Sequence, residues 1–397
     1  MKRILSFILV LCMTLSLCAC GTSSLFEDSS GESGLPAGEE LRVAVISEYS
    51  DIINQVFDQA IIDSCEDYCD DNHVEMNIYS PGEESAAGRM ESVDTAVADG
   101  YNVIVMNGAV STGSLVESAE KYPDIKFIGL GITDWDLLAE TLGEKFDYNP
   151  GNWVPTDYYR SENVYIASYQ EQVSGYLAGY AAAKMGYKKL GFLGAVESPL
   201  IARYGYGFVQ GVNDASPPDS GVEVNYVYAN QLNDDDDITD YMNGWYESGT
   251  KVVFSCGGTV YTSAAKAAEH ADGMMIGAVS DQAKAIDKKY GEGRTFTSAV
   301  TDYGMVITNI LSSIEDGAWL DYAGRIDSFG IVSSDKPEQN CVRLPSDSTL
   351  WTKDFSEDDY RDLLSRILNG EIQVANDLSA ESPSGENITV NYLGNIK

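Results

Sequence analysis

Short apolar runs alternate with stretches of helical periodicity along most of the chain, and this alternation restricts the fold more than any other feature of the sequence. Leu41–Ile46 is a short apolar run typical of a buried strand, and residues 56–68 then carry apolar side chains at helical spacing. Strand and helix keep alternating up to residue 130. Since a helix usually carries the chain back between parallel strands, the pattern predicts a parallel sheet with helices on both faces.

The alternation begins again at Val164, after an aromatic-rich stretch, residues 133–162, in which we expect a long loop or an insertion. Five further apolar runs then have the length and composition of strands: residues 164–167, 189–193, 223–228, 251–255 and 274–278. Segments with helical periodicity separate them. A second α/β run of this kind predicts two similar lobes.

The limits of the two lobes follow from where the pattern restarts. We expect the first lobe to comprise residues 41–163 and 293–322, and the second lobe residues 164–292 and 323–345. The first lobe takes two segments because the periodicity after residue 292 looks like a return of the chain to it. Residues 346–397 should form a C-terminal helix and a tail.

The N-terminus has the features of a secretory signal. Two basic residues precede the apolar segment Ile4–Leu17, which is too short for a lasting transmembrane helix. The sequence Leu17-Cys18-Ala19-Cys20 resembles a bacterial lipobox. By that resemblance, residues 1–19 are a lipoprotein signal peptide and Cys20 is the lipid-modified first residue. The alternative is ordinary signal cleavage nearby, with Cys20 incidental.

Residues 20–40 read as a flexible tether, because they are rich in Gly, Ser and Glu and lack an apolar period. Such a chain has a root-mean-square length of roughly 25 Å. It would hold the protein near the cell membrane, on the extracytoplasmic side. No other stretch approaches the run of about 18 apolar residues that a membrane span needs.

The charge balance and residue types exclude several partners. The chain has 25 Lys+Arg against 62 Asp+Glu, a formal net charge of −37, which argues against nucleic acid and anionic lipid. Two histidines give little basis for a metal site, and no phosphate-binding Gly-x-x-x-x-Gly-Lys-Ser/Thr motif occurs. The run Asp234–Asp237 lacks the pattern of a Ca²⁺ loop and favours a solvated start of a helix. We therefore expect no metal and no cofactor, and we expect Cys65 and Cys69 to be core residues.

Several segments together resemble one protein family. The most specific segments lie between Tyr169 and Ala215 and read Gly175-Tyr-Leu-Ala-Gly179, Leu190-Gly-Phe-Leu-Gly194 and Ser198-Pro-Leu-Ile-Ala-Arg-Tyr-Gly-Tyr-Gly-Phe208. Three more lie further along, at residues 254–258, 275–282 and 369–372. This ordered set resembles the basic membrane protein (Bmp) family, the lipid-anchored substrate-binding subunits of ABC importers, over roughly residues 41–375.

The resemblance implies a type I periplasmic-binding-protein fold. In that fold two α/β lobes, each a parallel sheet with helices on both faces, are joined by three crossings of the chain. The ligand lies in the cleft between the lobes, and in better-known family members it is a purine nucleoside. This agrees with the general rule that open α/β sheets bind ligands at the carboxyl ends of their strands.

Four candidate ligand-binding residues have counterparts in the family pattern. By the resemblance, Glu48 stands where the family has an Asp, Phe57 where it has a base-stacking Phe, and Asp58 where it has an Asn. Tyr204 occupies the stacking position of the other lobe. We expect Phe57 and Tyr204 to clamp a planar ring. The alternative is that Phe57 is a core residue and the carboxylates belong to a solvated turn.

Further candidates follow predicted strands. Asn107 and Gly108 end the third strand, and Asn107 offers a ligand both a donor and an acceptor, unless it only forms a turn. Gly257–Gly258 could present backbone N–H groups to a ligand or form only a tight turn. Arg203, beside Tyr204, is either a surface charge or the partner of a carboxylate.

Several positions depart from the family pattern. Gly131 and Val279 stand where the family has an Asp, and Thr301 falls where a Lys is expected at a lobe crossing. Asp281 could orient a ligand hydroxyl or cap a helix. We therefore expect this site to recognise its ligand through polar contacts different from those of a purine nucleoside site. A nucleoside remains the leading ligand class, and another ring-bearing solute is second.

The sequence thus predicts a monomeric binding protein that delivers a small molecule to an ABC permease and catalyses no reaction. One alternative is a ligand-sensing partner of a membrane receptor, built on the same fold. Another is an extracytoplasmic hydrolase, since paired carboxylates cannot be ruled out among so many acids. No Gly-x-Ser-x-Gly motif occurs, and His73 and His270 lie in no catalytic motif.

Overall fold

The structure, a computed structural model, describes residue 35 and residues 39–50, 56–146 and 152–397. The predicted signal peptide, the lipidation site Cys20 and most of the tether lie outside these residues. Within the described ranges no helix has both the length and the apolar character that crossing a bilayer demands.

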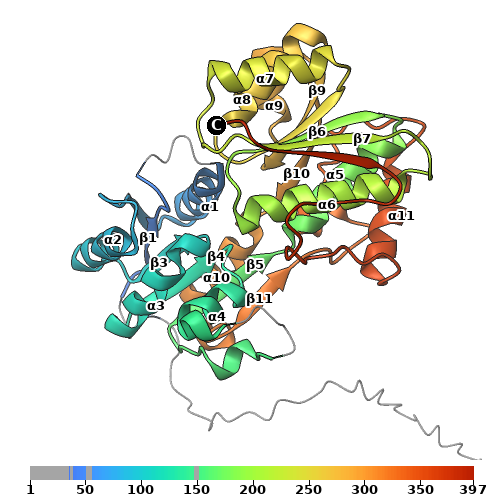
Figure 1. Cartoon of the computed structure of the whole chain (residues 1–397). Helices are drawn as coiled ribbons and strands as arrows, with labels where there is room; N and C mark the ends of the chain where they lie inside the picture. Colours follow the sequence, from blue (N-terminus) through green and yellow to red (C-terminus); the bar gives the residue numbers. More distant parts are fainter. Residues whose placement is uncertain (1–34, 36–38, 51–55, 147–151) are drawn as a thin grey trace, which may run out of the picture.

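The first sheet has six parallel strands in the order β11-β5-β4-β3-β1-β2. The strands are β1 (Arg42–Ile46), β2 (Glu75–Tyr79), β3 (Val103–Asn107), β4 (Lys126–Leu130), β5 (Val164–Tyr169) and β11 (Ile326–Phe329). Its helices are α1 (Val56–Asn72), α2 (Ala86–Ala98), α3 (Thr112–Lys121), α4 (Asp134–Leu142) and α10 (Gly304–Glu315). Figure 1 shows this lobe at the lower left.

Alternate side chains of β1 explain why helices cover both faces of the first sheet. Val43 and Val45 pack in one apolar cluster with residues of α1 and α10, whereas Ala44 and Ile46 pack in a second cluster with residues of α2 and α3. Successive side chains of a strand point to opposite faces, so a continuous apolar run needs cover on both sides.

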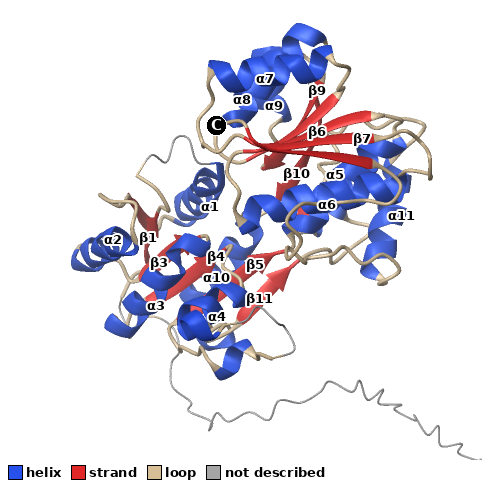
Figure 2. Cartoon of the chain, viewed as in Figure 1, coloured by secondary structure: helices blue, strands red, loops and turns tan. Residues whose placement is uncertain are grey.

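The second sheet has seven strands in the order β12-β10-β9-β8-β6-β7-β13, of which β12 alone runs antiparallel to its neighbour. The strands are β6 (Lys189–Gly194), β7 (Glu223–Tyr228), β8 (Val252–Cys256), β9 (Met274–Val279), β10 (Thr295–Thr301), β12 (Val342–Arg343) and β13 (Thr389–Asn395). Its helices are α5 (Glu171–Lys184), α6 (Pro199–Ala215), α7 (Asp236–Glu247), α8 (Val260–Ala271), α9 (Ala283–Tyr290) and α11 (Glu357–Leu368). Helices lie on both faces of this sheet as well (Figure 2).

Glycines allow α5 and α6 to pack with their backbones almost in contact. A Cβ at Gly175 would lie 2.2 Å from the Tyr204 carbonyl oxygen, and one at Gly207 would lie 1.9 Å from that of Gln172. No larger residue fits at these positions without moving a helix. The Gly-rich sequences of the two helices therefore fix α6, and with it Tyr204, against the start of α5.

The chain crosses between the lobes three times. The first crossing is Gln170, between β5 and α5; the second is 302–303, between β10 and α10; the third is 330–341, between β11 and β12.

These crossings differ from the predicted lobe boundaries. β5 pairs with β4 in the first sheet, although residue 164 was expected to open the second lobe. β10 pairs with β9 in the second sheet, although residues 293–322 were expected in the first, and β11, expected in the second lobe, pairs with β5. Periodicity shows where a strand lies but not which sheet it joins, which explains the difference.

Two segments contain more structure than we expected. The 133–162 stretch includes α4, which begins with a capping box between Thr133 and Asp136. The tail after residue 345 includes β13, which extends the second sheet by pairing in parallel with β7. β13 is the dark red strand beside β7 in Figure 1.

Candidate functional site

Side chains at the carboxyl ends of the first sheet's strands form a hydrogen-bonded group around Asp58. Its carboxylate accepts hydrogen bonds from the Glu48 backbone N–H, at 3.1 and 3.3 Å to the two oxygens, and from Nδ2 of Asn107 at 3.3 Å. Asp58 lies in the first turn of α1 and Asn107 ends β3; both are buried. Asp58 thus ties the segment after β1 to β3, and this places Glu48 at the mouth of the first lobe.

The Glu48 carboxylate lies against the backbone of Gly108. A Cβ built at Gly108 would come 1.5 Å from Oε1 of Glu48, and the φ of +71° at Gly108 also favours glycine. Arg89 also binds the backbone of this segment, because its Nη1 donates to the Glu48 carbonyl oxygen at 3.0 Å. Among the residues that the structure describes, none donates a hydrogen bond to the Glu48 carboxylate.

Two buried carboxyl groups this close together oppose each other's ionisation. Burial raises the pKa of Glu48 well above its ordinary value and the Asp58 charge raises it further, against the effect of Arg89. Burial also raises the pKa of Asp58 to about 6, although hydrogen bonds from Glu48 and Asn107 favour the ionised form. The pair therefore carries less than two full negative charges near neutral pH.

The predicted stacking pair is in direct contact across the two lobes. The ring centroids of Phe57 and Tyr204 are 6.4 Å apart, with the ring planes tilted by 45°. A planar ligand between two parallel rings would need roughly 7 Å, since stacked atoms sit about 3.5 Å apart. The two rings can therefore hold a third ring between them only after the lobes move apart, as in a hinge motion.

Arg203, Tyr204 and Thr301 are satisfied within the second lobe. The Tyr204 hydroxyl lies 2.5 Å from Oγ1 of Thr301, and both residues are buried. Nε of Arg203 donates to Oε2 of Glu171 at 2.9 Å in a buried ion pair. Arg203 is therefore not a surface charge, and the carboxylate that it contacts belongs to the protein.

Structural requirements account for the glycine pair and for Asp281. A Cβ at Gly257 or at Gly258 would lie 2.6 or 2.0 Å from a neighbouring atom, and both glycines have positive φ. Asp281 is exposed, and its carboxylate accepts from the N–H of Ala283, the first residue of α9, at 3.2 Å and from the Ser348 hydroxyl at 2.7 Å. These contacts match the tight-turn and helix-capping alternatives.

Val279 ends β9 in a strained turn at the cleft side of the second sheet. Its φ is +70°, and the N–H of Ser280 donates to the carbonyl of Ala278 at 2.8 Å. This bond closes a γ-turn, a conformation that is rare and unfavourable for a β-branched residue. Gly131, which follows β4 with φ +66°, shows the residue type that such a position usually takes.

The tyrosines at the crossings were not among the site residues predicted from the sequence. Tyr169 ends β5 and Tyr303 follows β10, and their rings pack edge to face with centroids 4.7 Å apart. Within the part of the chain that the structure describes, both hydroxyls and Oε1 of Glu171 are buried without a hydrogen-bond partner. A signal was present, since Tyr303 closely follows a predicted strand, but the strand was assigned to the other lobe.

The acidic run Asp234–Asp237 serves the start of α7. Asp235 accepts from the Ile238 N–H at 2.9 Å, Lys266 pairs with Asp234 at 3.1 Å, and Lys397 pairs with Asp235 and Asp237. In the described ranges no group of three or more His, Cys, Asp or Glu side chains is placed to hold a metal ion. The four cysteines there, Cys65, Cys69, Cys256 and Cys341, are free and buried.

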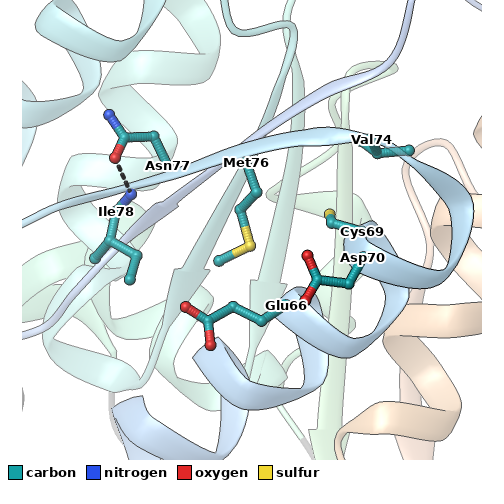
Figure 3. A pocket seen from close by; sticks show the side chains of 7 residues that line it. All are labelled: Glu66, Cys69, Asp70, Val74, Met76, Asn77 and Ile78. Atoms are coloured by element: carbon teal, nitrogen blue, oxygen red, sulfur yellow. Dashed lines mark hydrogen bonds between the residues drawn. The ribbon is translucent and has the colours of Figure 1, made fainter.

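A shallow hollow of about 420 Å³ lies away from the cleft, between α1 and the edge strand β2 (Figure 3). Its walls come from the last turns of α1, from the segment between α1 and β2, and from the middle of β2: Glu66, Cys69, Asp70, Val74, Met76, Asn77 and Ile78. None of the predicted ligand-binding residues lines this hollow.

Comparison with protein families separates the predicted binding protein from the hydrolase alternative. Residues 42–375 match the model of the Bmp family, described as ABC transporter substrate-binding protein PnrA-like. The chain belongs to this family. Family members are substrate-binding proteins of ABC transporters, so the prediction of a binding protein rather than an enzyme is confirmed.

Individual Bmp-family relatives are distant in sequence. The chain is 26% identical over 305 residues to the ABC transporter nucleoside-binding protein BmpA of Lactococcus lactis. The aligned region covers 73% of this chain and 79% of that protein. It is 25% identical over 255 residues to Basic membrane protein B of Borreliella burgdorferi, covering 63% and 68%.

Solved structures confirm the predicted fold. An ABC transporter solute-binding protein from Conexibacter woesei matches with a TM-score of 0.61 at 20% identity, covering 85% of this chain and 99% of the other. A solute-binding protein from Aeropyrum pernix matches with a TM-score of 0.63 at 15% identity, covering 86% and 95%. Both are solute-binding proteins of ABC transporter systems.

Proposed function

We propose that this protein is the lipid-anchored, extracytoplasmic and monomeric substrate-binding subunit of an ABC importer. It binds a small ring-bearing solute, with a nucleoside as the leading class, in the cleft between the lobes. The observation that carries this proposal is the contact of Phe57 from the first lobe with Tyr204 from the second. Asp58, the residue after Phe57, binds the Glu48 backbone and Asn107. The nucleoside-binding relative from Lactococcus lactis supports the ligand class.

The first-lobe residues suit a neutral ligand with hydrogen-bond donors. Phe57 offers an aromatic face, and Glu48 offers an acceptor to which no described residue donates a hydrogen bond. The nearby guanidinium, that of Arg89, donates to backbone carbonyls and does not offset an anionic ligand. Phosphorylated nucleosides should therefore be excluded by charge, whereas the parent nucleosides should not.

Calorimetry with adenosine, guanosine, inosine, cytidine and uridine tests the ligand class. Phe57→Ala should weaken the tightest of these complexes about tenfold, or about 1.4 kcal/mol, because an apolar stacking face is lost. Tyr122→Ala, at the far end of α3, is the matched control and should leave the affinity unchanged. Failure of all five nucleosides to bind the wild type would refute the nucleoside class.

Membrane fractionation tests the anchor. Cys20→Ala should move the protein to the soluble fraction, because stable anchoring of this kind needs the acyl chains on that cysteine. Cys18→Ala keeps a small residue in the lipobox and should leave the protein on membranes. Retention of the Cys20→Ala protein at the wild-type level would contradict lipid attachment at Cys20.

A further inference from the structure

Tyr303 carries a buried hydroxyl that has no hydrogen-bond partner among the described residues. The residue is 2% exposed, its ring packs edge to face on Tyr169, and its hydroxyl forms no hydrogen bond within the described part of the chain. Folded proteins rarely leave such a group unsatisfied, because its lost hydration is not replaced. Departures from this rule gather at functional sites.

The surroundings of this hydroxyl come from both lobes. The ring of Tyr303 contacts that of Tyr169, two residues before Glu171 of the second lobe. The charges of Glu171 and of Glu48, from the first lobe, both act on the hydroxyl, and Arg203 opposes them. Arg203 holds Oε2 of Glu171, while Oε1 of Glu171 is buried and has no hydrogen-bond partner among the described residues. No described residue donates a hydrogen bond to the Glu48 carboxylate either. Within the described ranges, two acceptors and one hydroxyl are therefore left without partners where the lobes meet.

We propose that Tyr303 contacts the ligand and, with Glu48 and Oε1 of Glu171, forms a subsite for a neutral vicinal diol. The inference rests on the proposed function, and for a nucleoside the diol would be that of the ribose. A ligand hydroxyl can donate to a carboxylate and accept from the phenol at once, so a pair of hydroxyls satisfies all three protein groups. An anionic group offers no hydrogen-bond donor to the two carboxyl groups, and an ammonium group has no acceptor for the phenol proton.

The experiment compares a ribonucleoside with its 2′,3′-dideoxy counterpart, which lacks the diol. Calorimetry uses the nucleoside of the five-member panel that the wild type binds most tightly, together with D-ribose. Tyr303→Phe should weaken the ribonucleoside about tenfold and leave the dideoxy compound unaffected, because only the former loses a hydrogen bond. Without ligand, the melting temperature of Tyr303→Phe should equal or exceed that of the wild type, since an unsatisfied hydroxyl has been removed.

Tyr290→Phe is the matched control. Tyr290 is also buried, and its hydroxyl likewise has no hydrogen-bond partner in the described ranges, but it lies at the end of α9. Its variant should bind both compounds like the wild type. If Tyr303→Phe does not fold, Glu48→Gln provides the same comparison and should penalise the ribonucleoside selectively.

The outcomes separate this inference from the proposed function. Equal wild-type affinities for the ribo and dideoxy compounds, or equal losses for both in Tyr303→Phe, would overturn the diol subsite and leave nucleoside binding intact. Binding of D-ribose alone, weakened by Tyr303→Phe, would support the subsite and overturn the nucleoside class. Binding of none of these compounds to the wild type would overturn both.

Discussion

The hydroxyl groups of Tyr204 and Thr301 lie 2.5 Å apart in a pair from which solvent is excluded. Tyr204 belongs to α6 and Thr301 ends β10, so this hydrogen bond ties a helix of the second lobe to the strand that leads into the second crossing. It also explains why a ligand would meet the ring of Tyr204 rather than its hydroxyl.

Tyr204→Phe should lower the free energy of unfolding by about 1–2 kcal/mol, because it leaves the buried Thr301 hydroxyl without a partner. Adding Thr301→Val removes that unsatisfied group and should recover most of the loss. Urea unfolding of the two single variants and the double variant measures the coupling. Strictly additive losses would show that the two hydroxyls do not stabilise each other.

Arg203→Met should destabilise the protein by about 3–5 kcal/mol, because it leaves Glu171 buried without its ion-pair partner. The double variant Arg203→Met/Glu171→Gln should lie much closer to the wild type in denaturant unfolding. Arg361→Met, which removes an exposed ion pair with Glu357 in α11, is the control and should change stability by less than about 1 kcal/mol. A small effect of Arg203→Met alone would mean that Glu171 gains another partner.

Stability should rise on mild acidification because of Asp58. Its pKa is raised to about 6 in the folded state from an ordinary value of 3.8, so between these values the folded state binds more protons than the unfolded state. The free energy of unfolding therefore increases as the pH falls through 6, by about 1 kcal/mol from pH 7.5 to pH 5. Asp58→Asn should abolish this part of the pH dependence in thermal unfolding, and an unchanged profile would contradict the shifted pKa.

Val279→Gly should lower the free energy of unfolding less than the removal of a buried side chain usually does. The loss of the buried side chain is offset by release of backbone strain of about 1–3 kcal/mol at positive φ. Val253→Gly is the matched control, because Val253 is equally buried but lies in the regular strand β8. It should lower the free energy of unfolding by about 1 kcal/mol more than Val279→Gly, or by a larger margin, because no strain is released there. Equal losses in urea unfolding would argue that Val279 is not strained.

The order of strands and helices was predictable, because the apolar residues of each buried helix or strand recur at the spacing typical of that element. The helix expected at residues 56–68 is α1, Val56–Asn72, and the strand expected at 223–228 is β7. The sheet to which β5 and β10 belong was not predictable, since strand pairing depends on contacts between distant segments. The start of α4 was missed even though the Thr133–Asp136 capping box is a local signal.

Part of the candidate site was also predictable from the sequence, and part was not. Glu48, Asp58 and Asn107 lie together because they follow neighbouring parallel strands or begin the helix between them, which topology alone requires. The partners of Arg203 and Tyr204 were not predictable, because they are set by the close packing of α5 on α6 and by the end of β10. Local sequence cannot show which buried polar group remains unpaired.

Strand β13 covers what would otherwise be a free edge of the second sheet. The family match ends at residue 375, so a protein trimmed to the matched region would lack β13 and leave β7 unpaired along one side. Tyr226 would also lose its contact with Tyr392, whose ring lies 5.7 Å away. An open strand of this kind templates pairing with other chains, so the trimmed protein should self-associate as its concentration rises, even with both lobes folded.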